Sequence, residues 1–363
     1  MAVSGFRFGL EGEYLLVDAP SYRPLWHPDL SFERLQGVLE SVSYEGLLGG
    51  LTLDGLELDP PHRRILPFCV EGYGLSGAEL LPWVDMLVKG VEIRTPVCPS
   101  INECLRVYEA LYQALQQALG EHGYRAVALA HHPLAWEYQG PQNHPRHDWW
   151  LWGMRAMTTY GPDVNLSLPE PERARFDWAK LQRRANHYVP ALVAFTLAAP
   201  VAHGGLWQVG GCTGLSARTY RRSPFGPAVA AHSKEQGRLE FKAFDMPVDR
   251  EDFAFYLLLW LWLVLDDQAP GEADDADRIY DLGAVARLGW GAGDVAERAE
   301  VLLDRAERLL ATLDVDPAPL QVPRRRLWAR RAPAHDLISR WEETPSVEAL
   351  LAHLDRVGAR VRS

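Results

Sequence analysis

The sequence FRFGLEGEYLLVD at residues 6–18 decides the fold. Hydrophobic and polar residues alternate at its beginning and its second half is apolar, which predicts a β-strand that is polar at one point of one face. Glu11 and Glu13 are separated by one residue, and alternate side chains of a strand share a face, so both carboxylates lie on the same side of the sheet. An acid on a buried strand face is costly unless a counter-charge or a metal ion accompanies it. The pair is therefore either a solvent-facing polar position or one corner of a binding site.

Other strand-like segments also carry acids among apolar neighbours. These are Glu57 in residues 51–58, Glu92 followed by Arg94 in residues 88–96, and Glu240 followed by Lys242 and Asp245 in residues 238–245. A cation two residues after an acid shares its strand face, as is needed where a metal-bound phosphate must be both coordinated and held by positive charge. Mg²⁺ prefers oxygen ligands in near-octahedral geometry, which carboxylates on rigid strands can provide. As a set, the segments favour a multi-metal phosphate site; each acid alone also fits a solvent-exposed position or a local ion pair.

The rest of the pattern predicts a mixed, mainly antiparallel sheet. Residues 51–58 alternate around Asp54-Gly55, a strong hairpin signal, and residues 100–122 have helical spacing after a capping box formed by Ser100 and Glu103. Further strands are predicted at residues 126–131 and 164–168, and further helices at residues 149–158, at 173–199 with Pro190 as a kink or interruption, and from about residue 250. Strands and helices alternate irregularly, which favours an α+β fold over a doubly wound parallel sheet.

The composition changes after Asp267. Residues 269–275 form an acidic linker, and the sequence beyond them is helical, with residues 296–313 as the clearest amphipathic segment. We therefore predict a first domain over residues 1–267 and a helical C-terminal region over residues 268–363 that packs on it. The basic sequence RRRLWARR at residues 324–331 fits either a solvated helix face or a lid over an anionic ligand.

The composition also limits the partners. The chain has 363 residues, of which 47% are hydrophobic, and a formal net charge of -11, so it can bury a large core and is repelled by nucleic acids and anionic membranes. We expect small-molecule substrates, no nucleic acid and no membrane. The N-terminus lacks the features of a secretory signal, and the apolar run at residues 256–265 is too short to cross a bilayer, so we expect a cytoplasmic protein with a buried helix there. The four cysteines have no CxxC spacing and are expected to be small buried hydrophobic residues.

Several common site motifs are absent from the sequence. The Gly-rich turn at residues 210–218 is neither GxxxxGK[ST] nor GxGxxG, so it predicts neither a P-loop nor a Rossmann site. GxSxG and a recognisable Cys/His nucleophile arrangement are also missing. A zinc site could be assembled from the histidines of residues 131–148, but no HExxH motif supports it. We favour surface or structural histidines, with His132 as a candidate substrate contact.

The ordered set of segments resembles glutamate–cysteine ligase family 2, the carboxylate–amine ligases distantly related to glutamine synthetase. The resemblance spans about residues 6–265 and is carried, in chain order, by GLEGE (9–13), YEG (44–46), LDP (58–60), VEIRTPVC (91–98), LAHHP (129–133), MRAMTT (154–159) with VNL (164–166), PALVAF (190–195) with AP (199–200), GLSAR (214–218) and EFKAFD (240–245). Two positions differ from the family's pattern. Lys242 stands where the family has Arg, and Asp163 stands where its branches have Gln or His.

The resemblance implies a fold and a set of site residues. The fold is an antiparallel sheet curved into a funnel and flanked by helices, with ATP and two or three Mg²⁺ ions at one end and the amino-acid substrate at the other. The implied metal ligands are Glu11, Glu13, Glu92 and Glu240, the implied catalytic cations are Arg94, Arg218 and Lys242, and the implied nucleotide contacts are Asn165, Ser216, Arg218 and His132. Because Lys242 and Asp163 fall near the expected substrate end, the resemblance does not fix the acid or the amine.

Together, the acid-bearing strands and the resemblance predict an ATP-dependent carboxylate–amine ligase whose catalytic domain is residues 1–267. Such a ligase forms an amide, of the γ-glutamyl type, through an acyl phosphate, with glutamate as the first candidate acid and an unassigned amine or amino acid as acceptor. Two alternatives stay open. The first is a ligase in a specialised biosynthetic pathway that acts on an amine carried by a protein or peptide, which residues 324–331 would grip. The second is a non-catalytic member that binds nucleotide or a partner.

Overall fold

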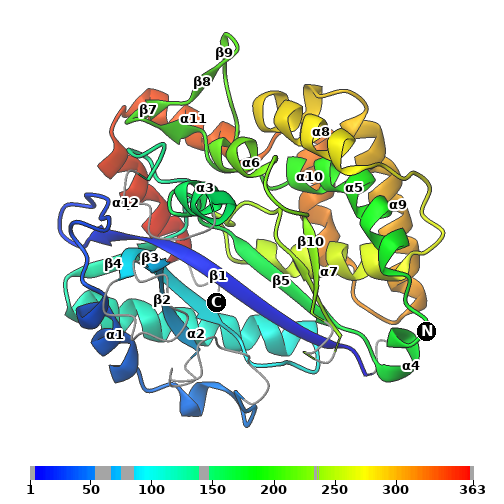
Figure 1. The fold of residues 1–363 in the computed structure, drawn as a ribbon, viewed down its shortest axis with the longest axis horizontal. Helices are drawn as coiled ribbons and strands as arrows, with labels where there is room; N and C mark the ends of the chain where they lie inside the picture. Colours follow the sequence, from blue (N-terminus) through cyan, green and yellow to red (C-terminus); the bar gives the residue numbers. More distant parts are fainter. Residues whose placement is uncertain are drawn as a thin grey trace.

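The computed structural model describes residues 5–53, 67–74, 86–138, 147–232, 235 and 237–359, apart from the side chains of residues 147–149. Within these residues seven strands form one sheet (Figure 1): β1 (Arg7–Asp18), β2 (Phe68–Gly74), β3 (Met86–Arg94), β4 (Tyr124–Val127), β5 (Pro162–Ser167), β10 (Val229–His232) and β11 (Arg238–Phe241). The strand order is β10-β11-β5-β1-β3-β2, and β4 also pairs with β1. Two small hairpins lie outside the sheet, β6 (Val201–Ala202) with β7 (Gly205–Leu206) and β8 (Gln208–Val209) with β9 (Cys212–Thr213).

Helices surround this sheet. Before the predicted linker they are α1 (Phe32–Ser41), α2 (Ile101–Glu121), α3 (His147–Ala156), α4 (Glu170–Arg173), α5 (Trp178–Ala194), α6 (Ala217–Arg222) and α7 (Asp252–Leu265). After it they are α8 (Asp275–Leu288), α9 (Val295–Thr312), α10 (Gln321–Ala329), α11 (Pro333–Glu343) and α12 (Val347–Gly358), with short 3₁₀ turns at Glu45–Leu47, Gly289–Gly291 and Ala318–Leu320. The predicted helix at residues 173–199 is shorter than expected, and Pro190 lies within α5 without interrupting it.

Every strand pair in the large sheet is antiparallel, which confirms the predicted α+β class with its curved antiparallel sheet. The predicted strand at residues 126–131 is instead the shorter β4. The cause is the crowded edge of β1, because β4 pairs with Leu15–Asp18 and β5 pairs with the preceding part of the same edge. The Asp54-Gly55 hairpin and Glu57 lie outside the described residues.

The central strand β1 separates a polar face from an apolar one. Its side chains alternate in burial, and Tyr14 on the apolar face shares a hydrogen bond of 2.9 Å with Tyr108 of α2. Gly12 lies between the two glutamates on this apolar side, where a Cβ atom would overlap the Tyr108 hydroxyl group. The Glu-Gly-Glu sequence is thus explained by packing: α2 crosses so closely behind β1 that only glycine fits between Glu11 and Glu13.

The long helix α2 begins at the predicted cap. Ser100 Oγ accepts a hydrogen bond from the Glu103 backbone N–H, as expected for an N-cap. The reciprocal half of the predicted capping box is replaced, because the Glu103 carboxylate accepts from the Arg106 guanidinium instead. The helix ends before Gly123, whose positive φ of 82° suits a residue without a Cβ atom.

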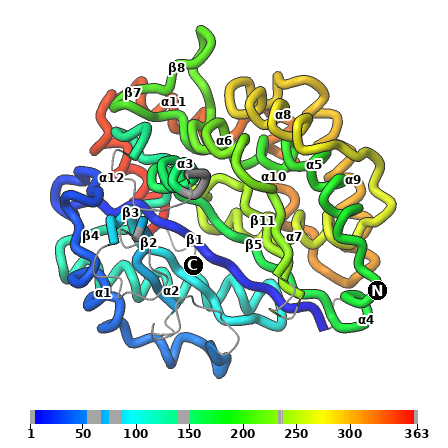
Figure 2. The backbone as a smooth tube through the Cα atoms, in the orientation of Figure 1, coloured from blue at the N-terminus to red at the C-terminus, as the bar shows by residue number. Residues whose placement is uncertain are grey.

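The C-terminal helices share the hydrophobic core with the rest of the chain. One continuous cluster of buried side chains runs from Phe6 to Ala334, and α5 packs against both α8 and α9. At the other end, α12 lies against β4, although the two are far apart in the sequence (Figure 2). The division at residue 267 remains a prediction, since these contacts join the two parts without marking a boundary.

The most apolar helix, α7, is buried along nearly its whole length, as predicted for residues 256–265. It packs against α2, α5, α9 and β5 in the centre of the molecule. Among the described residues, none of the helices is both long enough and apolar enough to cross a membrane.

The basic segment at residues 324–331 is engaged with acids of the same chain. Arg324 contacts Asp304 and Glu307 of α9 at 2.9 Å each, and Arg330 and Arg331 contact Glu300 and Asp336. Arg326 reaches inward, donating to the Phe195 carbonyl oxygen at 3.1 Å and contacting the buried Asp252 carboxylate at 2.7 Å. Four of the five arginines therefore have acidic partners within the fold. This arrangement favours a structural helix over a lid or a grip for an acidic partner.

Candidate functional site

A cavity of about 320 Å³ lies over the polar face of the sheet. The strands β1, β2, β3, β5, β10 and β11 provide one side, and α3 and α6 provide the other (Figure 1). Its charged lining consists of the acids Glu11, Glu13, Glu71, Glu92, Asp163 and Glu240 and the cations Lys89, Arg94, Arg218, Arg222, Arg238 and Lys242. Six acids and six cations make the fully ionised lining formally neutral.

Strand register brings the predicted acids together. Glu11 lies opposite Arg94 of β3 on one side and opposite Asp163 of β5 on the other, and Glu13 lies opposite Glu92. All four predicted metal ligands and all three predicted catalytic cations line the same cavity. Their convergence depends on antiparallel pairing of segments that are up to about 230 residues apart in the sequence, as from Glu11 to Glu240.

One group in this cavity has the donors of a hard metal site. Oxygen atoms of Glu11, Asp163 and Glu240 all lie within 4.8 Å of one another. An octahedral Mg²⁺ with ligands at about 2.1 Å holds its oxygens about 3–4 Å apart, so small side-chain movements would suffice. At present the Lys242 ammonium group lies between two of them, 3.1 Å from Asp163 and 2.8 Å from Glu240. The three carboxylates therefore fit Mg²⁺, and Lys242 would give up its place to the ion.

The electrostatics of this group are uneven. Burial raises the pKa of Glu11 to about 7, the Glu92 carboxylate adds to the rise, and Arg94 partly offsets it. Burial also raises the pKa of Asp163 to about 7, against the lowering effect of Lys242. For Glu240, burial acts in the same direction, but Lys242 and Arg238 outweigh it and bring the pKa to about 2. Glu11 and Asp163 thus have too little positive charge around them to offset their burial, and a divalent cation would supply it.

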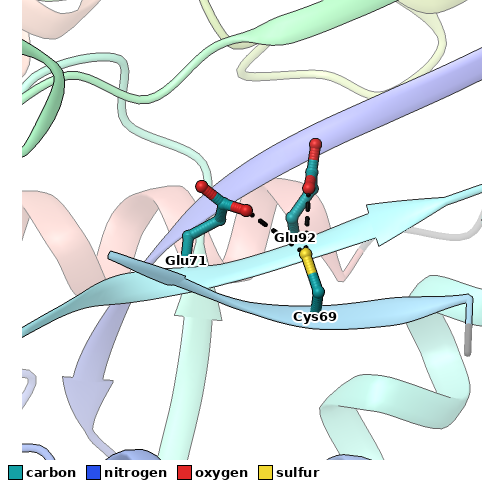
Figure 3. A group of neighbouring side chains, drawn as sticks. All are labelled: Cys69, Glu71 and Glu92. Atoms are coloured by element: carbon teal, nitrogen blue, oxygen red, sulfur yellow. Dashed lines mark hydrogen bonds between the residues drawn. The ribbon is translucent and has the colours of Figure 1, made fainter. Parts of the chain in front are cut away.

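A second group contains a thiol. Cys69 and Glu71 of β2 and Glu92 of β3 point toward one another (Figure 3), with Cys69 Sγ donating to Glu92 at 3.0 Å and lying 3.2 Å from Glu71. The Arg94 guanidinium contacts the same Glu92 oxygen at 2.7 Å. The expectation for Cys69 was only half right: it is buried, as predicted, but it contacts site acids and is not merely a small hydrophobic residue. Glu71 was missed because its neighbours give no alternation signal.

Lys89 is a site cation that the sequence pattern places on the wrong face. It lies three residues before Glu92, so strict alternation points it away from the cavity. The β2–β3 register shifts there, because Glu71 pairs with Gly90 whereas Gly72 pairs with Val88, and Lys89 is the extra residue of a β-bulge. Its ammonium group contacts Glu13 at 2.7 Å and donates to two backbone carbonyl oxygens. Although burial raises the pKa of Glu13, Lys89 outweighs that effect and lowers it.

Helix α6 contributes two arginines to the cavity. Arg218 donates to the carbonyl oxygens of Lys242 and Ala243 and lies 3.7 Å from the buried Asp245 carboxylate. Gly161 faces it at a point where a Cβ atom would overlap the guanidinium group. Arg222, one turn later on the helix, also lines the cavity and was not predicted.

The remaining predicted contacts lie behind the lining or away from it. Asn165 donates to Glu11 at 3.0 Å and accepts from Arg238 at 2.8 Å, so it orients two lining residues. Ser216 caps α6 by accepting from the Thr219 backbone N–H at 3.0 Å. His132 is buried and stacked on Trp26, and its Nδ1 accepts from two backbone N–H groups of the following turn. It therefore fits the favoured assignment as a structural histidine, and it is not among the residues that line the cavity.

The zinc alternative gains no support within the described residues. Histidine is absent from both groups of neighbouring ligands found there. His131 and His132 are buried against aromatic rings, while His144 and the side chain of His147 lie outside the described residues.

The cysteine environments allow a direct check of this geometry. Cys69, Cys98 and Cys104 are buried, whereas Cys212 is partly exposed. Burial, reinforced by Glu92, raises the pKa of the Cys69 thiol, so little thiolate forms. We expect iodoacetamide to modify Cys212 first and Cys69 no faster than the buried Cys104, as followed by peptide mass spectrometry. Modification of Cys69 at the rate of Cys212 would contradict the packing around Glu92.

Comparisons with known proteins identify a family and a similar fold. Residues 7–207 match the sequence profile of glutamate–cysteine ligase family 2. Among solved structures, the fold is similar to a bifunctional glutathione synthetase from Pasteurella multocida (TM-score 0.59, 16% identity, 98% of this chain and 51% of that chain) and to a glutamate–cysteine ligase from Francisella tularensis in complex with AMP (TM-score 0.60, 11% identity, 98% and 90%). The chain thus spans about half the length of the Pasteurella protein. A search of curated proteins gives no match.

Proposed function

Because the chain belongs to glutamate–cysteine ligase family 2, a family of ATP-dependent ligases, we propose that it joins a carboxylate to an amine at the cavity over the sheet. The acid is an amino acid, with glutamate as the first candidate, and the acceptor is a free amine or amino acid. The reaction proceeds through an acyl phosphate and releases ADP and phosphate.

The observation that carries this proposal is the mixed lining of the cavity. Carboxylates and cations from five strands and one helix meet there in equal number, and three of the carboxylates are close enough to share a cation. Each divalent ion that binds to a formally neutral lining leaves net positive charge, which an anionic substrate such as a nucleoside triphosphate can then neutralise. Mg²⁺ held by these carboxylates would supply the positive charge that polarises a phosphoryl group.

The residues of the chain divide between two tasks. Glu11, Asp163 and Glu240 would hold metal, with Asn165 fixing the Glu11 carboxylate. Arg94, Arg218 and Lys242 would hold anionic oxygens of the substrates. In the first step an oxygen of the acid forms a bond to the γ-phosphorus of ATP while the bond to ADP breaks. The amine nitrogen then attacks the acyl carbon, loses a proton and displaces phosphate.

The two departures from the family's pattern support a working site over a degenerate one. Lys242 and Asp163 contact each other at 3.1 Å and lie in one cavity wall. Lys at residue 242 has a shorter side chain than the Arg of the family. The acid at residue 163 gives this lysine a carboxylate partner, which Gln or His would not. Random decay does not favour such a matched pair, whereas a changed substrate does.

Turnover with a panel of acids and amines tests the proposal. We expect ADP release that requires Mg²⁺, one acid and one amine, detected by a coupled assay and confirmed by mass spectrometry of the amide. AMP as the nucleotide product would exclude the acyl-phosphate route. Tight binding of ATP without turnover over a broad panel would favour the non-catalytic alternative, and the absence of nucleotide binding would exclude a ligase acting on a free amine as well as one acting on a carried amine.

A further inference from the structure

Arg222 differs from every other cation in the cavity. Lys89, Arg94, Arg238 and Lys242 each contact at least one carboxylate at 3.0 Å or less, and Arg218 is held by two backbone carbonyl oxygens. Within the described part of the chain, the Arg222 guanidinium group has neither a hydrogen bond nor an ion pair, and it lies 5.9 Å from the centroid of the Trp152 ring. Its donors are therefore available to a ligand.

The position of Arg222 is built into the fold. It lies four residues after Arg218 on α6, so the two side chains share one face of the helix, while Arg221 between them points elsewhere, over the Trp136 ring. Ser216 caps this helix, which explains why a buried serine stands at its beginning. On the far side of the cavity, Glu13 and Asp163 are the acids that interact with Arg222 electrostatically.

We propose that Arg222 binds the phosphoryl group that passes from ATP to the acid, a role that rests on the proposed ligase function. A guanidinium group facing metal-binding carboxylates across a cavity is placed to contact an anion that bridges the two sides. A phosphoryl group has three non-bridging oxygens, so it can reach metal ions and a guanidinium group at once, whereas a carboxylate has two. As the oxygen of the acid bonds to phosphorus and the bond to ADP breaks, charge moves onto oxygens near this arginine, where it stabilises the transition state.

Binding measurements separate this role from a structural one. Calorimetry with Mg²⁺ compares the β,γ-imido analogue of ATP, ADP and glutamate as ligands of the wild-type protein, Arg222→Gln and Arg222→Lys. The Gln variant should raise the Kd of the ATP analogue about 10- to 100-fold, as expected for the loss of a charge-assisted hydrogen bond, with a much smaller change for ADP and none for glutamate. The Lys variant keeps the charge but loses the forked pair of guanidinium donors. Its Kd for the ATP analogue should therefore lie between those of the wild type and the Gln variant. Turnover of the Gln variant should drop about 10²–10³-fold.

Arg308→Gln is the matched control. Arg308 is exposed on α9, so this substitution removes the same charge outside the cavity. It should bind and turn over like the wild type, and all variants should unfold at a similar temperature, since among the described residues Arg222 has no hydrogen bond or ion pair to lose. Unchanged affinity for the ATP analogue in Arg222→Gln would overturn this inference alone. A loss confined to glutamate would also overturn it, by assigning Arg222 to the acid. If the wild-type protein binds no nucleotide, the proposed function fails as well.

Discussion

Replacing Glu240 with Gln should lower kcat about 10³-fold or more while leaving the protein folded. Glu240 is nearly fully buried, contacts Lys242 and Arg238, and lies with Glu11 and Asp163 in the proposed metal group. Stabilisation of transition-state charge by a bound metal ion contributes several kcal/mol, and about 4 kcal/mol corresponds to a factor of about 10³ in rate. The neutral amide keeps the shape of the side chain but removes one anionic ligand.

The fold should tolerate this change because the partners of Glu240 have other contacts. Lys242 keeps Asp163, and Arg238 keeps Glu235 at 2.6 Å. The variant should show a circular dichroism spectrum like that of the wild type, together with weaker binding of Mn²⁺ by electron paramagnetic resonance. Glu342→Gln, an exposed change on α11, is the control for the loss of one charge and should be fully active. Wild-type turnover in Glu240→Gln would remove Glu240 from the metal group.

Replacing Arg326 with Met should lower the free energy of unfolding by about 3 kcal/mol, the lower end of the range for breaking a buried ion pair from one side. Arg326 contacts Asp252, whose carboxylate is buried, and donates to the Phe195 carbonyl oxygen. Methionine fills a similar length but leaves the buried acid without its cation. Burial already raises the pKa of Asp252 to about 6 in spite of Arg326, so removal of the arginine should force this acid further toward its neutral form.

Arg325→Met provides a matched comparison one residue away. Arg325 is exposed on the same helix, α10, so the substitution should change the stability by less than about 0.5 kcal/mol. Chemical denaturation followed by circular dichroism measures both variants. If Arg325→Met destabilised the protein as much as Arg326→Met, the basic segment would act through its net charge instead of through this ion pair. Lost activity in a fully stable Arg326→Met would restore the lid interpretation.

Much of the site could be predicted because alternation along a strand is a local property. The faces of Glu11, Glu13, Glu92 and Glu240 follow from their spacing, and the structure gathers all four in one cavity. Of the nucleotide contacts inferred by resemblance, Arg218 lines the same cavity, but the other three do not. Asn165 and Ser216 support other residues, and His132 packs in a turn.

The Glu-Gly-Glu segment at residues 11–13 shows the limit of what the sequence alone can predict. By itself it determined a strand, a shared face for two carboxylates and, with the later segments, membership of a ligase family. Only the tertiary structure decided what surrounds them: the bulge that turns Lys89 inward, the contact between Cys69 and Glu92, and the presentation of Arg222 by α6. Each of these depends on register between strands or on the packing of a distant helix. Such features arise from contacts between residues far apart in the chain, and local periodicity carries no information about them.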